Sequence, residues 1–307
     1  MIAYLCKRVA GLVALLIAIS ILVFMIIRLI PGNPALVILG TAGGNPATVA
    51  RLDHQLGLDQ PVVVQYFKWV GGVLTGNFGY SYSQQRSVSS LLAANIGPTI
   101  QLTVAALILA LFFGTIIGVA AAMRRNSRFD TISMGFAITA MSIPSFWLGL
   151  VLLILFADVF PIFNVIGGPG LKGLVLPAVT LSMAEAGFIA RFVRSSVIEA
   201  ERQKHVTVAR AKGISASAVL FRHILRNSTL PVLTVVGIQF GNLVAGTVIV
   251  ETVFSRQGIG RLLVNAIVGK DYPTVQATVL LIAVLYSLVN FIVDMLYPIL
   301  DRRAARW

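Results

Sequence analysis

The amino-acid sequence predicts an all-α membrane protein with about six transmembrane helices and an extended external segment after the first of them. Three observations support this fold class. Of the 307 residues, 57% are hydrophobic and only 11% are charged, and the mean hydropathy is +0.90. Apolar runs of the length that spans a bilayer core, about 20 residues, recur along the chain. The polar segments between these runs are rich in lysine and arginine, as cytoplasmic loops of membrane proteins are.

Composition also limits the classes of function. The net charge of +13 is accounted for by basic loops at a membrane, so it does not call for a nucleic-acid partner. Cys6 is the single cysteine, which excludes an intrachain disulfide and a cysteine cluster for a metal, and the three histidines show no ligand spacing. No Gly-x-x-x-x-Gly-Lys-Ser/Thr loop occurs. We therefore expect no cysteine- or histidine-based metal site and no Walker-type nucleotide site in this chain.

Residues 1–30 are expected to form the first transmembrane helix. Lys7 and Arg8 precede a predominantly apolar run that extends to Ile30, and the sequence Pro-Gly-Asn-Pro at 31–34 ends it. The run is too long for the apolar part of a signal peptide. We interpret it as a retained span whose N-terminus lies in the cytoplasm.

Residues 31–98 are expected to lie outside the membrane as an amphipathic segment. Asn45 and Pro46 begin a helix that Gly57 ends, since proline favours the first helical turn and glycine the position just past a helix. Pro61 opens a second helix, Val62–Leu74, whose aromatic side chains suit a membrane surface.

Residues 99–307 are expected to form the core domain, with five further spans and a short outer helix near 261–268. The spans are expected at about 99–123, 132–156, 174–193, 231–250 and 278–299. With this arrangement the inner segments hold twice as many lysine and arginine residues as the outer ones. This asymmetry places both termini in the cytoplasm.

Some residues within these spans are candidates for lining a transport path. Pro144 is expected to bend the third span, because proline frees a carbonyl and cannot continue the hydrogen-bond ladder; Ser142 and Ser145 flank it. Glu185 in the fourth span and Asp294 in the sixth are carboxylates within the membrane, which are costly unless they are paired, protonated or in contact with water.

The segment 199–230 is predicted to form an elbow of two short helices on the cytoplasmic side. Residues 209–213 indicate a short helix that ends at Gly213, because glycine adopts the left-handed conformation of such an ending at little cost. Apolar residues at helical spacing follow, at 219, 220, 224 and 225. Residues 204–230 contain five lysine and arginine residues and no acid.

This elbow resembles the coupling loop, or EAA loop, of ABC importer permeases. Ala209, Ala211 and Gly213 match the small-residue helix and its glycine, and the pair Ile224-Leu225 follows at the expected distance. Thr207 stands where the family often has glutamate, and Arg226 where it often has proline. Both departures are typical of the dipeptide and oligopeptide permease branch.

The resemblance covers nearly the whole chain. The sequence motifs LGLDQP (56–61), QYFKW (65–69) and GNFGYS (76–81) resemble the external segment of the B-type peptide permease subunit, with Asn77 in place of aspartate. The words IPSFWLG (143–149) and LPAVTL (176–181) are also similar to that branch. The words ETVF (251–254) and GIGRLL (258–263) resemble a further family motif, with Gln257 in place of proline.

The resemblance implies a type I ABC importer permease fold in a bacterial inner membrane. It implies partners: a second, C-type permease subunit, two ATPase subunits that bind ATP and Mg²⁺, and an extracytoplasmic substrate-binding protein. This chain would itself be non-catalytic and bind no cofactor of its own. It would form half of the translocation path for a peptide and transmit the motion of the ATPases through the elbow. The resemblance assigns the following residues to ATPase coupling: Thr207, Ala209, Arg210, Ala211, Lys212 and Gly213.

Other functions stay open on the sequence. An ion-gradient-driven secondary transporter would use Glu185 and Asp294 as its relay, but such folds show paired repeats, and the two halves of this chain do not match. A receptor or assembly protein that transports nothing is a further alternative. Within the importer family, the substrate could be a dipeptide, a longer peptide, a nickel chelate, haem or glutathione.

Overall fold

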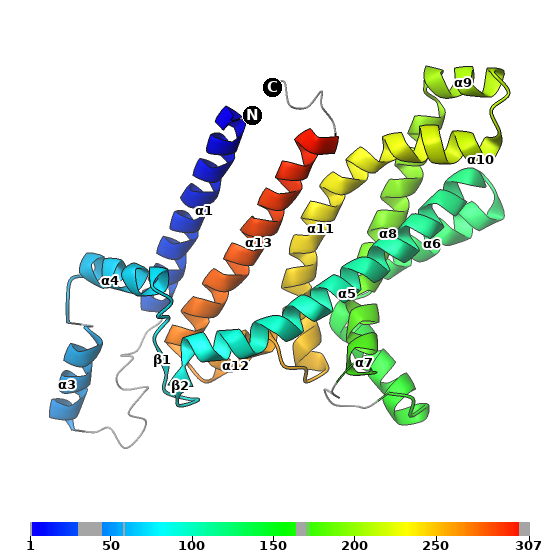
Figure 1. Cartoon of the computed structure of the whole chain (residues 1–307). Helices are drawn as coiled ribbons and strands as arrows, with labels where there is room; N and C mark the ends of the chain where they lie inside the picture. The colour runs from blue at the N-terminus through cyan, green and yellow to red at the C-terminus, as the bar shows by residue number, and fades with distance from the viewer. Residues whose placement is uncertain (1, 30–44, 58, 164–169, 171, 301–307) are drawn as a thin grey trace. The chain divides into compact units, whose positions relative to one another are not determined.

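The computed structural model describes residues 2–29, 45–57, 59–163, 170 and 172–300, and these are almost entirely helical (Figure 1). The chain divides into two compact units. One unit contains residues 1–98 and 257–287, and the other contains residues 99–256 and 288–307.

In the first unit, helix α4 (Val62–Leu74) packs across helix α1 (Ile2–Leu29), as Figure 1 shows. The Phe24 ring of α1 contacts Tyr66 and Trp69 of α4, with ring centroids 5.2 and 5.7 Å apart. The hydroxyls of Ser20 and Tyr66 share a hydrogen bond of 2.8 Å. Aromatic rings with a polar tip therefore hold the amphipathic helix on the first span.

The caps expected for helix α3 (Pro46–Leu56) are confirmed. The Asn45 side chain accepts a hydrogen bond of 3.0 Å from the Ala47 N–H, and Gly57 follows the helix with a φ of 67°. The first is a side-chain N-cap and the second a left-handed C-cap. Local capping chemistry therefore sets both ends of this helix, and the expected bounds of α4 are confirmed too.

A small β-hairpin joins the external segment to the other part of the first unit. Strand β1 (Tyr80–Ser81) pairs antiparallel with β2 (Arg86–Ser87). The buried carboxylate of Asp271 accepts hydrogen bonds from Ser81 and, at 2.8 Å, from Ser83. The hairpin is thereby fixed to the turn between helices α12 (Ile259–Val268) and α13 (Tyr272–Leu300).

Helix α5 (Val88–Met123) begins well before the expected position near residue 99. Its first turns bury Val88, Leu91 and Leu92 against Ile259 and Leu262 of α12. These apolar residues at positions i, i+3 and i+4 form a helical stripe that extends the span. The helix continues through Pro98.

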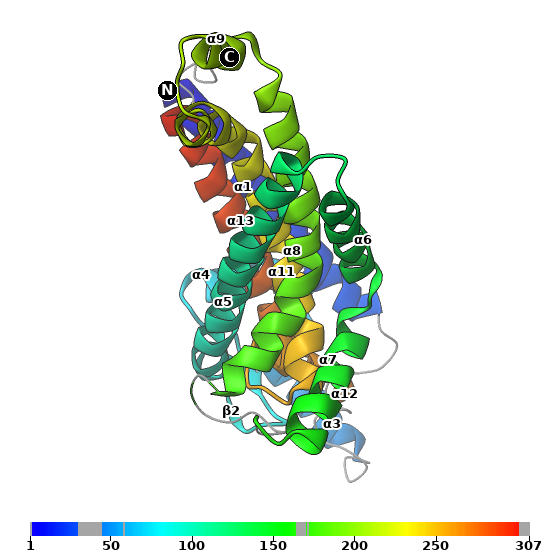
Figure 2. The ribbon, with the colours of Figure 1, turned by 90° about the vertical axis from the view of Figure 1, so that its right-hand side faces the viewer.

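Helix α8 (Lys172–Glu201) is the central element of the second unit. Helices α5, α6 (Arg128–Ser142) and α11 (Arg226–Val253) pack around it (Figure 2). Glycines permit the close crossings. A Cβ added to Gly118 of α5 would lie 2.5 Å from the Ala190 carbonyl oxygen, and one added to Gly114 would lie 2.8 Å from Ile189. Gly114 and Gly118 form a Gly-x-x-x-Gly pattern, which lets membrane helices approach backbone to backbone.

The third span, which we expected to bend at Pro144, is interrupted there. Helix α6 (Arg128–Ser142) and helix α7 (Ser145–Leu153) are separate, with a bend of 99° between them, and a π-helix (Ile154–Val159) continues α7. Ile143 is extended, with φ −78° and ψ 123°. The residue before a proline is driven out of the helical region, so Pro144 breaks the helix instead of bending it.

Length and composition confirm a helical membrane protein. Among the described residues, four helices are long and apolar enough to cross a membrane, and the bent pair of α6 and α7 would make a fifth. Helix α11 has 28 residues and covers the expected span at 231–250. Most side chains in its first turns lie outside the described part of the chain.

Candidate functional site

The predicted elbow is present at the end of α8. Helix α9 (Lys204–Ala211) follows it, then a short helix α10 (Ala216–Val219), and a π-helix (Leu220–Leu225) leads into α11. Gly213 has a φ of 76°, and its N–H donates to the Arg210 carbonyl at 2.9 Å. The helix that ends at a left-handed glycine is therefore confirmed, and Gly213 sets the direction in which the chain leaves α9.

The elbow has an apolar core of its own. Val206 and Ala209 of α9 are buried together with Val219 and Ile224, and this cluster continues onto Val197 of α8. Packing of this kind fixes a short helix that would be marginal in isolation. Displacement of α9 would therefore be transmitted to α8 as a movement of packed side chains.

The remaining coupling candidates form the outward face of the elbow. Thr207, Arg210, Ala211 and Lys212 are exposed, and so is Val208, at 52%. Ala209, by contrast, is only 4% exposed and faces the elbow core. The sequence interpretation did not separate these two faces, although the i, i+3 spacing of Val206 and Ala209 carried the signal.

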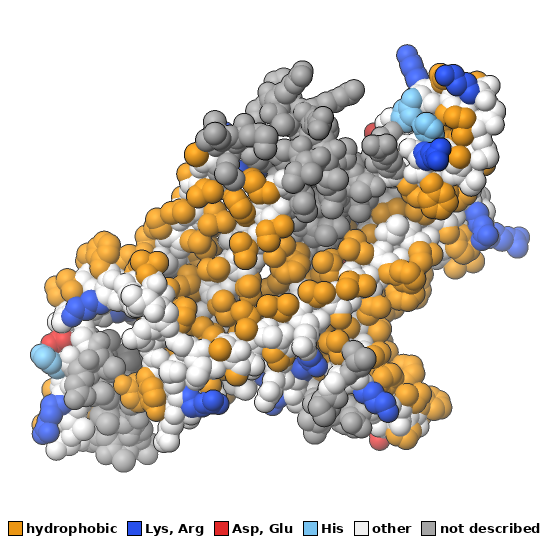
Figure 3. Space-filling model, viewed as in Figure 1, with side chains coloured by type: hydrophobic (Ala, Val, Ile, Leu, Met, Phe, Trp, Pro, Cys, Tyr) orange, Lys and Arg blue, Asp and Glu red, His pale blue; other side chains and the backbone are white. Residues whose placement is uncertain are grey.

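Basic side chains surround this face. Figure 3 shows lysine, arginine and histidine side chains gathered over α9 and the segment that follows it. The Arg210 guanidinium donates to the Glu201 carboxylate at 2.5 Å, and both side chains are partly exposed to solvent. An ion pair at such a surface adds little stability. The pair does connect the C-terminal end of α9 to the end of α8.

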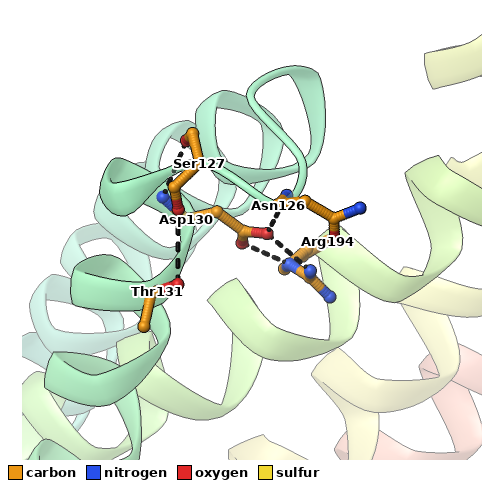
Figure 4. A network of polar contacts seen from close by, with 5 residues as sticks. All are labelled: Asn126, Ser127, Asp130, Thr131 and Arg194. Atoms are coloured by element: carbon orange, nitrogen blue, oxygen red, sulfur yellow. Dashed lines mark hydrogen bonds and ion pairs between the residues drawn. The ribbon is translucent and has the colours of Figure 1, made fainter.

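A second ion pair lies deeper, where α6 meets α8 (Figure 4). Arg194 donates to both carboxylate oxygens of Asp130, at 2.6 and 2.7 Å. Asp130 also accepts from the Asn126 N–H at 3.0 Å, and its own N–H donates to the Ser127 side chain at 3.3 Å. This is a bidentate, charge-assisted contact joined to a helix cap. It fixes the start of α6 to the part of α8 that precedes the elbow.

The ion pair between Asp130 and Arg194 was not predicted from the sequence. The pattern Ser127-x-x-Asp130 did carry the signal of a helix N-terminus. The pairing across 64 positions of the chain had no local signal.

The path candidates at the proline are placed at the break between α6 and α7. Ser142 and Pro144 are exposed and Ser145 is half-buried. The Ser142 hydroxyl donates to the Ile138 carbonyl at 3.0 Å, so its hydrogen-bonding capacity is partly used within its own helix.

Glu185 is placed elsewhere, at the contact between α8 and α11. Its carboxylate accepts a hydrogen bond from the Gln239 amide. The Gln239 carbonyl oxygen in turn accepts from the Asn242 amide at 3.1 Å. No polar contact is recorded between Glu185 and the serines of the break within the described part of the chain. The Asp294 side chain lies outside the described residues.

The described residues contain no group of three or more His, Cys, Asp or Glu side chains placed to hold a metal ion. His205 and His223 of the elbow lie near each other, with ring centroids 6.3 Å apart. Two imidazoles at this separation fall short of the three or four ligands of a typical protein metal site.

Two family models match the sequence. Residues 114–306 match the model of the "Binding-protein-dependent transport system inner membrane component". Residues 1–103 match the N-terminal model of the same kind of membrane component. Together the two models cover nearly the whole chain.

Proteins of similar sequence and structure agree with the family models. The glutathione transport system permease protein GsiC of Salmonella paratyphi A is 40% identical over 301 residues, which are 98% of each chain. GsiC of Escherichia coli K12 is 36% identical with the same coverage. Among solved structures, a chain of the inward-facing MetNI methionine ABC transporter superposes with a TM-score of 0.61 at 19% identity, covering 69% of this chain and 97% of that one. This likeness shows the fold.

Proposed function

We propose a function from one premise: this chain belongs to the family of binding-protein-dependent transport system inner-membrane components. It is thus a permease subunit of an ABC importer and a multi-pass protein of the inner membrane. Membership removes the basis for an ion-gradient-driven secondary transporter. The proposal concerns what this subunit does within the importer.

The subunit transmits the motion of the ATPases to the membrane spans that line a path between two permeases. The observation that carries this proposal is the two-sided structure of α9. Val206 and Ala209 pack on the same core as α8, while Thr207, Val208 and Ala211 are presented outward. A small-residue helix with one face free and the other fixed to a span is suited to sit in a groove of an ATPase. Movement of the ATPase would then bias the spans between two packings.

The partners follow from this role. Two ATPase subunits hold ATP and Mg²⁺, a second, C-type permease supplies the other half of the path, and an extracytoplasmic binding protein delivers the substrate. The elbow and both termini lie in the cytoplasm, in agreement with the basic side chains over α9. The hairpin and α12 lie outside.

The substrate is a peptide. Relatives that match along 98% of this chain include permeases of glutathione transport systems, and glutathione is itself a small peptide. We include it in the proposed class with di- and oligopeptides, and we rank nickel chelates and haem below it.

The subunit composition tests this proposal. With all candidate subunits co-expressed and a tag on this chain alone, we expect native mass spectrometry of the detergent-purified particle to give one copy of this chain, one different permease and two ATPase copies. A transport-competent particle with two copies of this chain would contradict the proposal, and so would one copy without a second permease.

A further inference from the structure

Three hydrogen-bonded polar side chains connect α8 to the exposed surface of α11. Glu185 lies near the middle of α8, and Gln239 and Asn242 lie near the middle of α11. Gln239 is only 3% exposed, and it connects the half-buried Glu185 to the exposed Asn242. Polar groups inside a membrane protein are expensive and face the bundle interior or water. Because Asn242 is exposed, these polar side chains mark the side of α11 that we expect to contact water or a polar ligand.

The rest of the exposed face of α11 agrees with this assignment. Where the side chains of α11 are described, the exposed residues at helical spacing are Asn242, Ala245, Ile249 and Thr252, and three of these four are small or polar. Helix α1, which is long and apolar enough to span a membrane, looks different: it exposes Val13, Ile17 and Leu22. The contrast indicates that this face of α11 is turned toward a path or a partner helix.

Glu185 retains acceptor capacity in this setting. Within the described part of the chain its carboxylate takes part in no ion pair, and one of its oxygens accepts the Gln239 amide. A carboxylate has room for several donors. The carbonyl oxygen of Asn242 adds a neutral acceptor at the exposed end. A cation with several N–H donors fits this set of acceptors, and the carboxylate repels an anionic group.

We propose that Glu185, Gln239 and Asn242 form a subsite in the translocation path that binds the protonated amino group of a peptide substrate as it passes. The subsite rests on the proposed function of this chain as half of a peptide path. Glu185 supplies the charge, Gln239 orients the carboxylate, and Asn242 accepts from the ammonium at the surface. The carboxyl end of the peptide is directed away from this site.

A purely structural role is the competing explanation, since polar side chains also hold membrane helices together. The two explanations differ in the replacement Glu185→Gln. Glutamine keeps an oxygen that accepts from Gln239, so a structural contact survives, but the charge that binds an ammonium is lost. Asn242→Leu separates them in the same way, because it removes the surface acceptor and leaves the contact between Glu185 and Gln239 intact.

The test uses the complete importer in proteoliposomes, with trialanine as the probe. We expect both Glu185→Gln and Asn242→Leu to lower ATP-driven uptake about tenfold or more, the loss that follows from a charge-assisted hydrogen bond. Trialanine affinity of the binding protein, basal ATP hydrolysis and melting temperature should stay at the wild-type level. Thr252→Val is the matched control on the same face of α11; its hydroxyl donates to the Val248 carbonyl at 2.7 Å, and uptake should not change.

A chemical readout identifies the amino group. A membrane-permeant carbodiimide adds to a carboxyl group and gives an O-acylisourea. The amino group of a bound peptide, once it has lost its proton to water, attacks the acyl carbon, forms an amide and displaces the urea. We expect labelled trialanine to couple to the wild-type chain at Glu185 during turnover, and not to the Glu185→Gln chain. Wild-type uptake rates in both variants, or coupling that is unchanged in Glu185→Gln, would overturn the subsite. Absence of ATP-driven peptide uptake by the wild type would instead refute the proposed function.

Discussion

Replacement of Gly213 by valine is expected to lower ATP-driven uptake about tenfold while the complex still assembles and hydrolyses ATP. Gly213 has a φ of 76°, and a β-branched residue is strained there by about 1–3 kcal/mol. No neighbouring atom lies within 4 Å of an added Cβ, so the backbone alone carries the effect. The elbow relieves the strain by changing the exit direction of the chain, which misplaces α9 relative to α8. Each 1.4 kcal/mol lost in coupling corresponds to about a factor of ten.

Two further variants control this result. Gly213→Asn should retain most of the uptake, because asparagine tolerates the left-handed region. Gly57→Val introduces the same strain at a φ of 67° in the external segment, away from the elbow, and should not uncouple hydrolysis from uptake. Uptake and hydrolysis are measured in the same vesicles. Unaltered uptake in Gly213→Val would remove Gly213 from the coupling mechanism.

Loss of the ion pair between Asp130 and Arg194 is expected to give the largest fall in stability. Asp130→Ala leaves the Arg194 guanidinium, whose side chain is 27% exposed, without its bidentate partner. Removing one member of a buried pair costs about 3–5 kcal/mol, and the partial exposure of Arg194 places the cost at about the lower end. The melting temperature of the purified complex should fall by several degrees, as measured by scanning fluorimetry.

The exposed pair between Arg210 and Glu201 provides a matched control. Its N–O distance of 2.5 Å is close to the 2.6 Å of the deeper pair. The exposed fractions of its side chains are 55% and 39%, so Glu201→Ala should cost less than about 1 kcal/mol. Asp130→Ala and Arg194→Ala should also be non-additive in the double variant. Equal melting temperatures for Asp130→Ala and Glu201→Ala would show that the deeper pair does not fix α6 to α8.

Features with local causes could be predicted from the sequence. The ends of α3 follow from Asn45 and Gly57, the start of α4 follows from Pro61, and the end of α9 follows from Gly213. Each is decided by the chemistry of one residue at one helix terminus, so no knowledge of the remaining chain is needed.

Features that depend on distant partners could not be predicted. The pairing of Asp130 with Arg194 and the contact of Glu185 with Gln239 each join helices that are far apart in sequence. The early start of α5 follows from packing on α12. The sequence predicts an irregular helix at Pro144. Whether the proline bends or breaks the helix depends on how the flanking helices pack, which the sequence does not show.

The central claim is that the exposed face of α9 docks on an ATPase in the cytoplasm, and site-directed cross-linking tests it most directly. In a Cys6→Ser background, Val208→Cys is labelled with a photoreactive maleimide in the assembled importer. Val268→Cys is the matched control, because Val268 is an exposed valine near the end of α12, on the side that we expect outside. We predict a cross-link to an ATPase subunit from position 208, with a yield that depends on ATP, and none from position 268. No ATPase cross-link from position 208, or one from position 268, would contradict the account.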